Sequence, residues 1–143
     1  MRSLWSKSAM PRIRGFSLIE LMIVLAIITI IASIAVPSYM NQVRKSKRTD
    51  AMSALLKMKM EEEIWRSDHP SYTSEMGAAG LNLPTTTEGG YYTLSIPEAT
   101  AYAFTLKATA VGDQANDGVG GQTCKILTID QNNNKSPDVC WIK

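Results

Sequence analysis

The chain has 143 residues, with 15 lysines and arginines, 13 acidic residues, two cysteines and a formal net charge of +2. This length accommodates one modest domain and argues against two. Four of the basic residues and none of the acidic residues lie in 1–15, which leaves 11 basic and 13 acidic residues in 16–143. Most of the chain is therefore slightly acidic, which argues against nucleic acid as a direct ligand.

An apolar stretch follows the basic N-terminus. Residues 16–36 contain one ionisable side chain, Glu20, and the run 21–36 has only Thr29 and Ser33 as polar residues. A helix of this length, at about 1.5 Å per residue, is roughly 31 Å long, which matches the hydrocarbon core of a bilayer. Its aliphatic side chains favour insertion by roughly 4–8 kcal/mol, against about 3 kcal/mol for a central carboxylate. The stretch predicts a transmembrane helix.

A core helix and a secretory signal are the alternatives to a transmembrane helix here. A buried core helix that is apolar on every side needs more protein around it than the remaining 107 residues supply. A cleaved secretory signal with Ser33-Ile34-Ala35 as its small-x-small site would release a small secreted binding domain after Ala35. The run is longer than most signal cores and begins with Glu20, which favours the membrane helix.

The junction before the apolar run is the most specific motif. Arg12-Ile13-Arg14-Gly15 is followed at once by Phe16-Ser17-Leu18-Ile19-Glu20. This resembles the type IV prepilin signature, with glycine last in the leader, phenylalanine first and glutamate fifth in the mature chain. The resemblance extends through Pro37-Ser38-Tyr39. It implies that a prepilin peptidase cuts after Gly15 and methylates the amine of Phe16. A start at Met10 would give the short leader that is common in this family.

Glu20 is a candidate for subunit assembly, since an ionisable group in a membrane helix is a functional candidate by default. One interpretation is that Glu20 offsets the dipole of the helix N-terminus, which is worth about 0.3–1 kcal/mol. The other is that it pairs with the ammonium of Phe16 in a neighbouring subunit, because an unpaired charge in a low-dielectric medium costs several kcal/mol. The family resemblance implies this second, assembly role.

The helix is predicted to continue to about Arg66 and to reach roughly 75 Å in length. Pro37 lacks an amide hydrogen, which predicts a kink near the bilayer surface. Two apolar faces follow; we expect the first to pack on a sheet, whereas the second suggests partners or a domain that wraps the helix more deeply. The acidic run 61–63 (Glu61, Glu62, Glu63) is expected to be a solvated face. The first face comprises Ala51, Ala54, Leu55, Met58 and Trp65, and the second Met52, Leu56, Met60 and Ile64.

The remaining residues predict a small antiparallel sheet. Residues 67–90 are rich in glycine and proline and are expected to form loops, with the single histidine, His69, on the surface. Apolar and polar residues alternate over 91–96 and 102–110, and a third apolar run covers 126–129, after a turn at 118–121. The predicted fold is α+β, with a long N-terminal helix packed on three or four strands.

Cys124 and Cys140 enclose 15 residues, and in an exported domain such a pair predicts a disulfide worth about 3 kcal/mol. Zinc would need two further ligands, which His69 alone does not supply. Type IVa pilins likewise have a C-terminal disulfide, and the sequence 124–141 resembles PilE-type minor pilins.

Two acidic loops are candidates for calcium sites. Residues 130–134 place oxygen ligands at alternate positions, but Lys135 replaces the required glycine and Trp141 the bidentate glutamate. Asp113 and Asp117 form a weaker acidic loop. We therefore expect an Asn-rich turn and no metal.

The sequence contains no nucleophile–base pattern and no phosphate-binding glycine loop, so neither enzymatic activity nor a cofactor is expected.

The resemblance implies a domain order and a function. Residues 1–15 form a cleaved leader, 16–37 the transmembrane and filament-core helix, 38–66 an amphipathic half, and 67–143 a globular pilin head. The chain is expected to be a type IV pilin, and a minor pilin in particular, with its leader in the cytoplasm and its head in the periplasm before assembly into an extracellular filament. Other pilin subunits, prepilin peptidase, an inner-membrane assembly platform and the lipid bilayer are the implied partners. Such filaments serve adhesion, twitching motility and DNA uptake. A type II secretion pseudopilin is the rival within the class.

Overall fold

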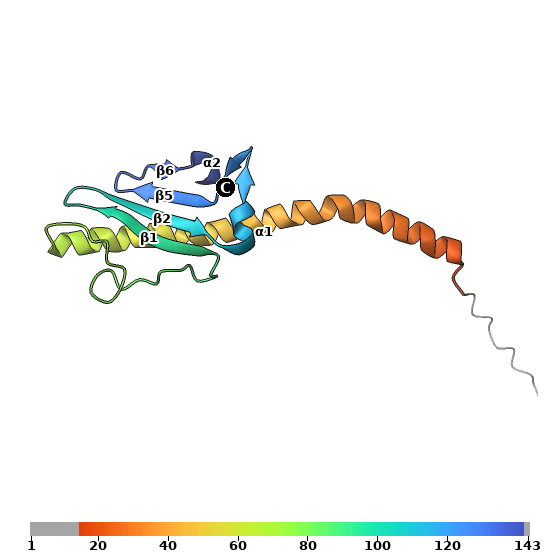
Figure 1. Cartoon of the computed structure of the whole chain (residues 1–143), viewed down its shortest axis with the longest axis horizontal. Helices are drawn as coiled ribbons and strands as arrows, with labels where there is room; N and C mark the ends of the chain where they lie inside the picture. Colours follow the sequence, from red (N-terminus) through yellow and green to blue (C-terminus); the bar gives the residue numbers. More distant parts are fainter. Residues whose placement is uncertain (1–14, 142–143) are drawn as a thin grey trace, which may run out of the picture. The chain divides into compact units, whose positions relative to one another are not determined.

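The computed structural model describes residues 15–141, so the predicted leader lies outside the described residues except for Gly15. The chain divides after Ser38, and Tyr39–Lys143 forms a second unit, called the globular domain below. The described residues form two α-helices, one 3-10 helix (η1) and six strands, shown in Figure 1. In chain order they are α1 (Leu18–Asp68), β1 (Tyr92–Ala99), β2 (Phe104–Ala110), η1 (Gly112–Asn116), β3 (Gly118–Val119), β4 (Gln122–Thr123), β5 (Ile126–Asp130), β6 (Lys135–Ser136) and α2 (Asp138–Trp141).

Helix α1 confirms the predicted long helix within two residues at each end and spans 51 residues. Glu20 lies in its first turn and Arg66 in its last turn, where each charge opposes the helix dipole. The helix continues through Pro37, which contributes no amide hydrogen. The kink expected at Pro37 stays a prediction.

The main sheet has four antiparallel strands in the order β1-β2-β5-β6, which confirms the predicted α+β class. β1 extends past the predicted end at Ile96 because the register shifts between Ser95 and Glu98. Pro97 lies at this irregularity in the outermost strand, where its missing amide hydrogen removes no bond from the sheet centre. The short β6 was not predicted.

The core of the globular domain lies between α1 and one face of the sheet (Figure 1). Buried side chains alternate along β1, β2 and β5, as the sequence predicted for the first two of these strands. The first predicted face of α1 supplies Ala51, Leu55 and Met58, which are almost completely buried. The predicted face is therefore confirmed as the one that packs on the sheet.

The turn predicted at 118–121 is a two-residue hairpin between β3 and β4. Gly120 and Gly121 both have positive φ, 57° and 84°, which a type I′ hairpin turn requires and glycine adopts without strain. The preceding η1 and this hairpin place Asp113, Gln114 and Asp117 against α1, as described below.

One prediction for α1 is wrong. Residues 61–63 do not form a uniformly solvated face, because Glu62 is fully buried while Glu63 is exposed. Glu62 lies four residues after Met58 and therefore points to the same side of the helix as the buried apolar residues.

Candidate functional site

The first candidate surface is the apolar part of α1. All side chains of residues 16–36 are exposed, and α1 contains one stretch that is long and apolar enough to cross a bilayer. The two hydroxyls of the run 21–36 are satisfied within the helix: Thr29 Oγ1 donates to the Leu25 carbonyl and Ser33 Oγ to the Ile30 carbonyl, both at 2.7 Å. Since these bonds leave no side-chain donor unpaired in the run 21–36, the run suits a medium without water.

The predicted processing and assembly residues lie at the start of this stretch. Among residues 15–141, a Cβ atom added to Gly15 would meet nothing within 4 Å, so packing within this part of the chain does not require glycine there. Phe16 is 82% exposed. Glu20 is exposed as well, and within residues 15–141 it takes part in no ion pair. Cleavage, methylation and the assembly role of Glu20 stay predictions.

The second candidate surface is an apolar ridge on the globular part of α1, formed by Leu56, Met60 and Ile64. These side chains are 42%, 66% and 58% exposed, respectively. They belong to the second predicted face, whose fourth member, Met52, is partly buried and packs against the core. The exposure of the other three shows that the domain does not cover this side of the helix beyond Met52. Three large apolar side chains at helical spacing on the outside of a domain mark a surface suited to a partner.

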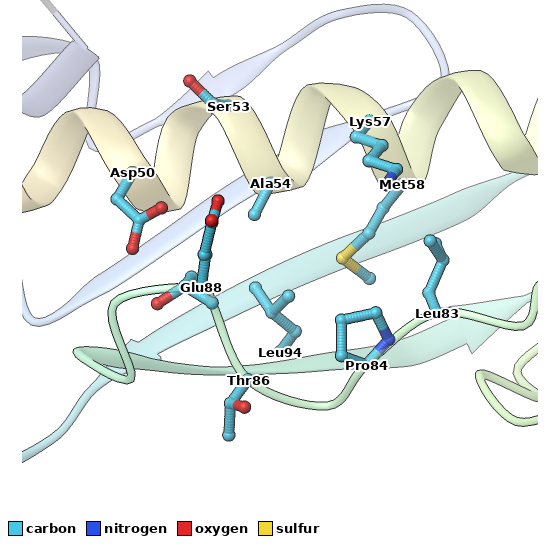
Figure 2. A pocket seen from close by; sticks show the side chains of 11 residues that line it. Asp50, Ser53, Ala54, Lys57, Met58, Leu83, Pro84, Thr86, Glu88 and Leu94 are labelled. Carbon is cyan, nitrogen blue, oxygen red and sulfur yellow. The ribbon is translucent and has the colours of Figure 1, made fainter.

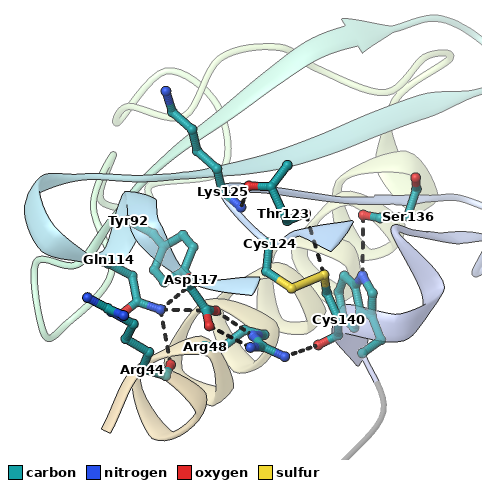
Figure 3. The surroundings of a disulfide bond; sticks show 11 residues. Arg44, Arg48, Tyr92, Gln114, Asp117, Thr123, Cys124, Lys125, Ser136 and Cys140 are labelled. Carbon is teal, nitrogen blue, oxygen red and sulfur yellow. Dashed lines mark hydrogen bonds and ion pairs between the residues drawn. A yellow bond between two sulfur atoms is a disulfide. The ribbon is translucent and has the colours of Figure 1, made fainter. Parts of the chain in front are cut away.

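A buried polar cluster joins α1 to the segment after β2 (Figure 3). Arg48 donates from Nε and Nη2 to both carboxylate oxygens of Asp117, each at 2.6 Å, and both side chains are buried. Gln114 Nε2 lies 3.0 Å from both the Arg44 carbonyl and the Tyr92 hydroxyl. Burial raises the pKa of Tyr92, so its hydroxyl stays neutral. These bonds hold the segment after β2 against α1, because moving it away would leave a buried charge without its partner.

A second ion pair lies at the edge of this cluster. Arg44 Nη2 donates to Asp113 Oδ1 at 3.0 Å, and the aspartate remains half exposed. This hydrogen bond from Arg44 is the main cause that lowers the pKa of Asp113. The two aspartates of the weaker acidic loop therefore serve as partners of arginines in α1. The sequence had assigned no role in the fold to either arginine.

The predicted disulfide between Cys124 and Cys140 is confirmed, with an S–S distance of 2.06 Å and both cysteines fully buried. Figure 3 shows Arg48 between Asp117 and the C-terminal segment, where its Nη1 donates to the Cys140 carbonyl at 3.3 Å. The backbone amide of Cys124 donates to the Asp117 carbonyl at 2.9 Å. The disulfide and the ion pair thus fix the same C-terminal region to α1.

A small pocket lies between α1 and the segment before β1 (Figure 2). Its volume is about 210 Å³, below the roughly 300–1,000 Å³ that is typical of small-molecule sites. Ala54, Met58 and Leu94 supply its apolar lining, and Asp50, Lys57 and Glu88 are among its polar lining residues. Its lining contains no histidine or cysteine, so it offers no nucleophile activated by an imidazole.

The remaining sequence candidates have structural roles. Asp130 accepts hydrogen bonds from the amide and side chain of Asn134, at 2.8 and 2.7 Å, and Asn133 has a φ of 66°. This confirms the Asn-rich turn. His69 is exposed, as predicted, and its ring stacks on Trp65 at 3.7 Å. Within residues 15–141, no cluster of three or more His, Cys, Asp or Glu side chains has the geometry to hold a metal ion.

Two family models match the sequence. Residues 37–128 match the model described as type IV minor pilin ComP, DNA uptake sequence receptor. Residues 10–36 match the prokaryotic N-terminal methylation motif. The first match covers more than half of the chain, and the second covers the junction and apolar run that carried the resemblance seen in the sequence.

Curated relatives share sequence with the chain. It is 38% identical to prepilin peptidase-dependent protein D of Escherichia coli K12 over 79 residues, 54% of each protein, and so spans about half the length of that relative. It is 34% identical to fimbrial protein EcpC of Eikenella corrodens over 113 residues, 79% of this chain and 72% of that protein.

A solved structure supports the fold. The type IV pilin from Shewanella oneidensis matches with a TM-score of 0.51 at 23% identity, over 70% of this chain and 99% of that chain. A long N-terminal helix packed on a small antiparallel sheet is therefore shared between the two, independently of close sequence similarity.

Proposed function

Because the chain belongs to the family of type IV minor pilins, we propose that it is cut between Gly15 and Phe16 and polymerised through α1. In this proposal a prepilin peptidase removes residues 1–15 and methylates the new amine of Phe16. The single observation that carries the proposal is the matched methylation motif, residues 10–36, whose apolar residues 16–36 all have exposed side chains.

The environment of Gly15 supports cleavage at this position. Nothing in the described chain contacts the space where a Cβ atom would stand, so the glycine has no packing role that the structure reveals. A protease that must approach the backbone closely supplies a reason for glycine here. Phe16, immediately after it, is exposed and accessible to a methylating enzyme.

Glu20 supports assembly through pairing between subunits. Its carboxylate lies in the first turn of a helix that is apolar on all sides, and the described residues offer it no cation. Cleavage after Gly15 creates an ammonium four residues away on the same chain and on every neighbouring chain. A pair between Glu20 and the Phe16 ammonium of a neighbour offsets the cost of burying both charges in the filament core.

The apolar ridge of Leu56, Met60 and Ile64 extends the assembly surface into the globular domain. Because every subunit is anchored by the same end of α1, the partner across this ridge is a pilin helix that runs in the same direction. Removing three large apolar side chains from water contributes to assembly, at roughly 25 cal/mol for each Å² buried.

Membrane anchoring through the apolar helix and assembly into a pilus with other pilins follow from the family. We infer the finer topology from the sequence: the leader lies in the cytoplasm and the globular domain in the periplasm until an inner-membrane platform feeds the subunit into the filament. The chain has a second basic cluster at 44–48, so counting basic residues on the two sides of the apolar run does not decide the orientation, and the orientation proposed here rests on the family.

Two rival functions make different predictions. A secreted binding domain would be released after Ala35 and would lack residues 16–35. A type II secretion pseudopilin would keep the same processing but would not enter a surface filament. The match of the globular domain to a minor pilin model favours the pilus.

Cell fractionation of two variants and one control variant tests the proposal. Gly15→Val is expected to leave unprocessed precursor in the membrane, whereas Gly77→Val, which also has room for a side chain, is expected to mature normally. Glu20→Ala is expected to be processed but to fall at least about tenfold in the sheared-filament fraction, as the loss of one ion pair worth about 1.4 kcal/mol would give. Normal maturation of Gly15→Val, or a wild-type level of Glu20→Ala in filaments, contradicts the proposal.

Contact with DNA is a second candidate function, which the printed description of the matching family makes worth testing. One row of residues crosses all four strands of the sheet: Ser95, Lys107, Thr128 and Ser136 are successive register partners. Hydroxyls and an ammonium in such a row suit phosphate oxygens. In residues 15–141 Lys107 forms no ion pair. The slightly acidic composition argued against such a ligand, and that prediction is still open.

Titration of the full chain with duplex DNA at several salt concentrations tests this candidate. Lys107→Ala is expected to weaken binding and to reduce the slope of log affinity against log salt by about one. Lys57→Ala, an exposed lysine on α1, is the control and should leave the slope unchanged. If the native chain does not bind, or if both variants bind alike, the row is not a DNA contact.

A further inference from the structure

The buried Glu62 of α1 is covered by a segment that lies between α1 and β1 in the chain. This segment, residues 72–83, is called the strap below, and Met76 and Leu81 anchor it in the core. The strap closes on itself through hydrogen bonds from the Leu81 amide to the Glu75 carbonyl and from the Leu83 amide to the Met76 carbonyl. It therefore behaves as one small unit that docks on the domain.

Among the described residues, one hydrogen bond joins the backbone of the strap to α1, and Glu62 accepts it. The amide of Thr73 donates to Glu62 Oε2 at 3.1 Å. The other carboxylate oxygen, Oε1, is buried and has no hydrogen-bond partner. A fully buried carboxylate with half of its acceptor capacity unused is unusual, because an unsatisfied buried polar atom costs about 1–3 kcal/mol.

The charged and titratable groups around Glu62 do not neutralise it. On α1, Glu63 adds a second negative charge, and Arg66 donates instead to the carbonyls of His69 and Ala101. On the strap, the Tyr72 hydroxyl bonds to Glu63, and Glu75 is exposed. From the sheet, Phe104 of β2 packs on Tyr72 with an aromatic ring.

The more distant charges also leave Glu62 without a counter-ion. Lys59, which is partly buried, acts on the carboxylate of Asp130 in β5, and Glu98 of β1 is exposed. Neither ion pair in residues 15–141 includes Glu62. An ionised Glu62 would therefore be a buried negative charge beside a second one.

We propose that Glu62 is a proton-sensitive latch: the strap docks tightly on α1 while the Glu62 carboxyl is protonated and opens locally when it ionises. The protonated carboxyl still accepts the Thr73 amide bond through its carbonyl oxygen and carries no buried charge. The ionised carboxylate is better solvated when the strap lifts and water reaches Oε1.

The electrostatic surroundings of Glu62 favour the same behaviour. Burial, with a smaller contribution from Glu63, raises the pKa of Glu62 above its ordinary value of 4.5, although the Thr73 bond opposes this. The proton therefore leaves at a higher pH than from a solvated glutamate. For a domain displayed outside the cytoplasm, where pH follows the medium, such a group couples the docking of the strap to external acidity.

Hydrogen exchange of the full chain in detergent micelles tests the latch. The Tyr72 and Thr73 amides donate to the Thr100 carbonyl and to Glu62, and both lose these bonds when the strap lifts. Their protection is measured between pH 5 and pH 8, corrected for intrinsic exchange, and referred to amides of β2. We expect strap protection to fall about tenfold relative to β2 as pH rises, since one proton linked to opening gives up to about tenfold per pH unit.

Two variants assign the effect to one carboxyl. Glu62→Gln keeps the acceptor for Thr73 and cannot ionise, so its strap is expected to stay protected at pH 8 with no pH dependence. Glu63→Gln, the exposed neighbour, should keep the pH dependence. A strap in the native chain that does not respond to pH overturns the proposal by itself, even if Glu62→Gln fails to fold. A response that persists in Glu62→Gln, or disappears in Glu63→Gln, also overturns it.

Discussion

The two parts of α1 share a secondary structure and differ in what stabilises it. Residues 18–38 bury no side chain within the chain, whereas residues 39–68 place Ala51, Leu55 and Met58 against the sheet. The first part is rich in isoleucine, a β-branched and only moderate helix former, and the second in methionine, lysine and glutamate, which are good ones.

This difference separates two sources of helix stability. A helix of β-branched residues is stable where no water competes for the hydrogen bonds of its backbone, as in a bilayer or a bundle of helices. A helix of strong helix formers packed on a sheet is stable in water. The first part of α1 therefore depends on its surroundings and the second on the globular domain, and changes in one part should leave the other intact.

The largest effect is expected for Arg48→Ala. This change leaves Asp117 buried without a partner and removes the bond to the Cys140 carbonyl, so the free energy of unfolding of the globular domain should fall by about 3–5 kcal/mol. Chemical denaturation followed by near-ultraviolet circular dichroism measures it. Arg44→Ala, whose partner is exposed, should have a much smaller effect. Equal losses for the two arginines would contradict the importance of the buried cluster.

Two methionines two residues apart sharpen the comparison between buried and exposed faces. Met58→Ala opens a cavity in the core and should lower the free energy of unfolding by about 2–5 kcal/mol. Met60→Ala, on the ridge, should change it by less than about 0.5 kcal/mol but reduce the amount recovered in sheared filaments. A ridge variant that assembles normally would remove the ridge from the assembly surface.

Removing the disulfide tests in a single experiment whether the globular domain and the membrane helix are stabilised independently. Replacing Cys124 and Cys140 together by serine should lower the free energy of unfolding by about 3 kcal/mol, because the open chain regains loop entropy. Extraction with carbonate should show that the variant remains in the membrane, since residues 18–38 are untouched. An unchanged melting temperature, or loss of the variant from the membrane, would be inconsistent with this division.

The smallest effect is the pH dependence that Glu62 contributes. Because the folded-state pKa is raised above 4.5, the folded domain holds this proton more tightly than the unfolded chain. Stability is therefore highest below about pH 4.5 and falls as pH rises through the folded-state pKa. Glu62→Gln should lack this loss and become more stable relative to the native chain toward neutral pH. Denaturation midpoints at pH 4 and pH 7.5 for both chains check the sign.

Much of the fold follows from local patterns in the sequence. The apolar alternation over 91–96 and 102–110 and the apolar run 126–129 predicted three strands, and the helix was predicted to within two residues at each end. β6 was missed because two residues carry no alternation. The membrane junction was recognised because its glycine, phenylalanine and glutamate lie close together in the sequence.

The buried polar residues were harder to predict. Arg48 and Asp117 are 69 positions apart, and no local pattern joins them. One signal was nevertheless present: Arg48, Ala51, Leu55, Met58 and Glu62 follow one another at intervals of three and four residues. Extending the buried stripe by one step beyond its apolar members would have indicated that both charged residues are buried, although not which groups they meet.

The most direct test of the whole account is the N-terminal sequence of the chain in filaments sheared from the cells that produce it. Processing after Gly15 predicts N-methylated Phe16 as the first residue, followed by Ser17 and Leu18. A first residue at Val36, an intact leader beginning at Met1 or Met10, or absence of the chain from sheared filaments would contradict it.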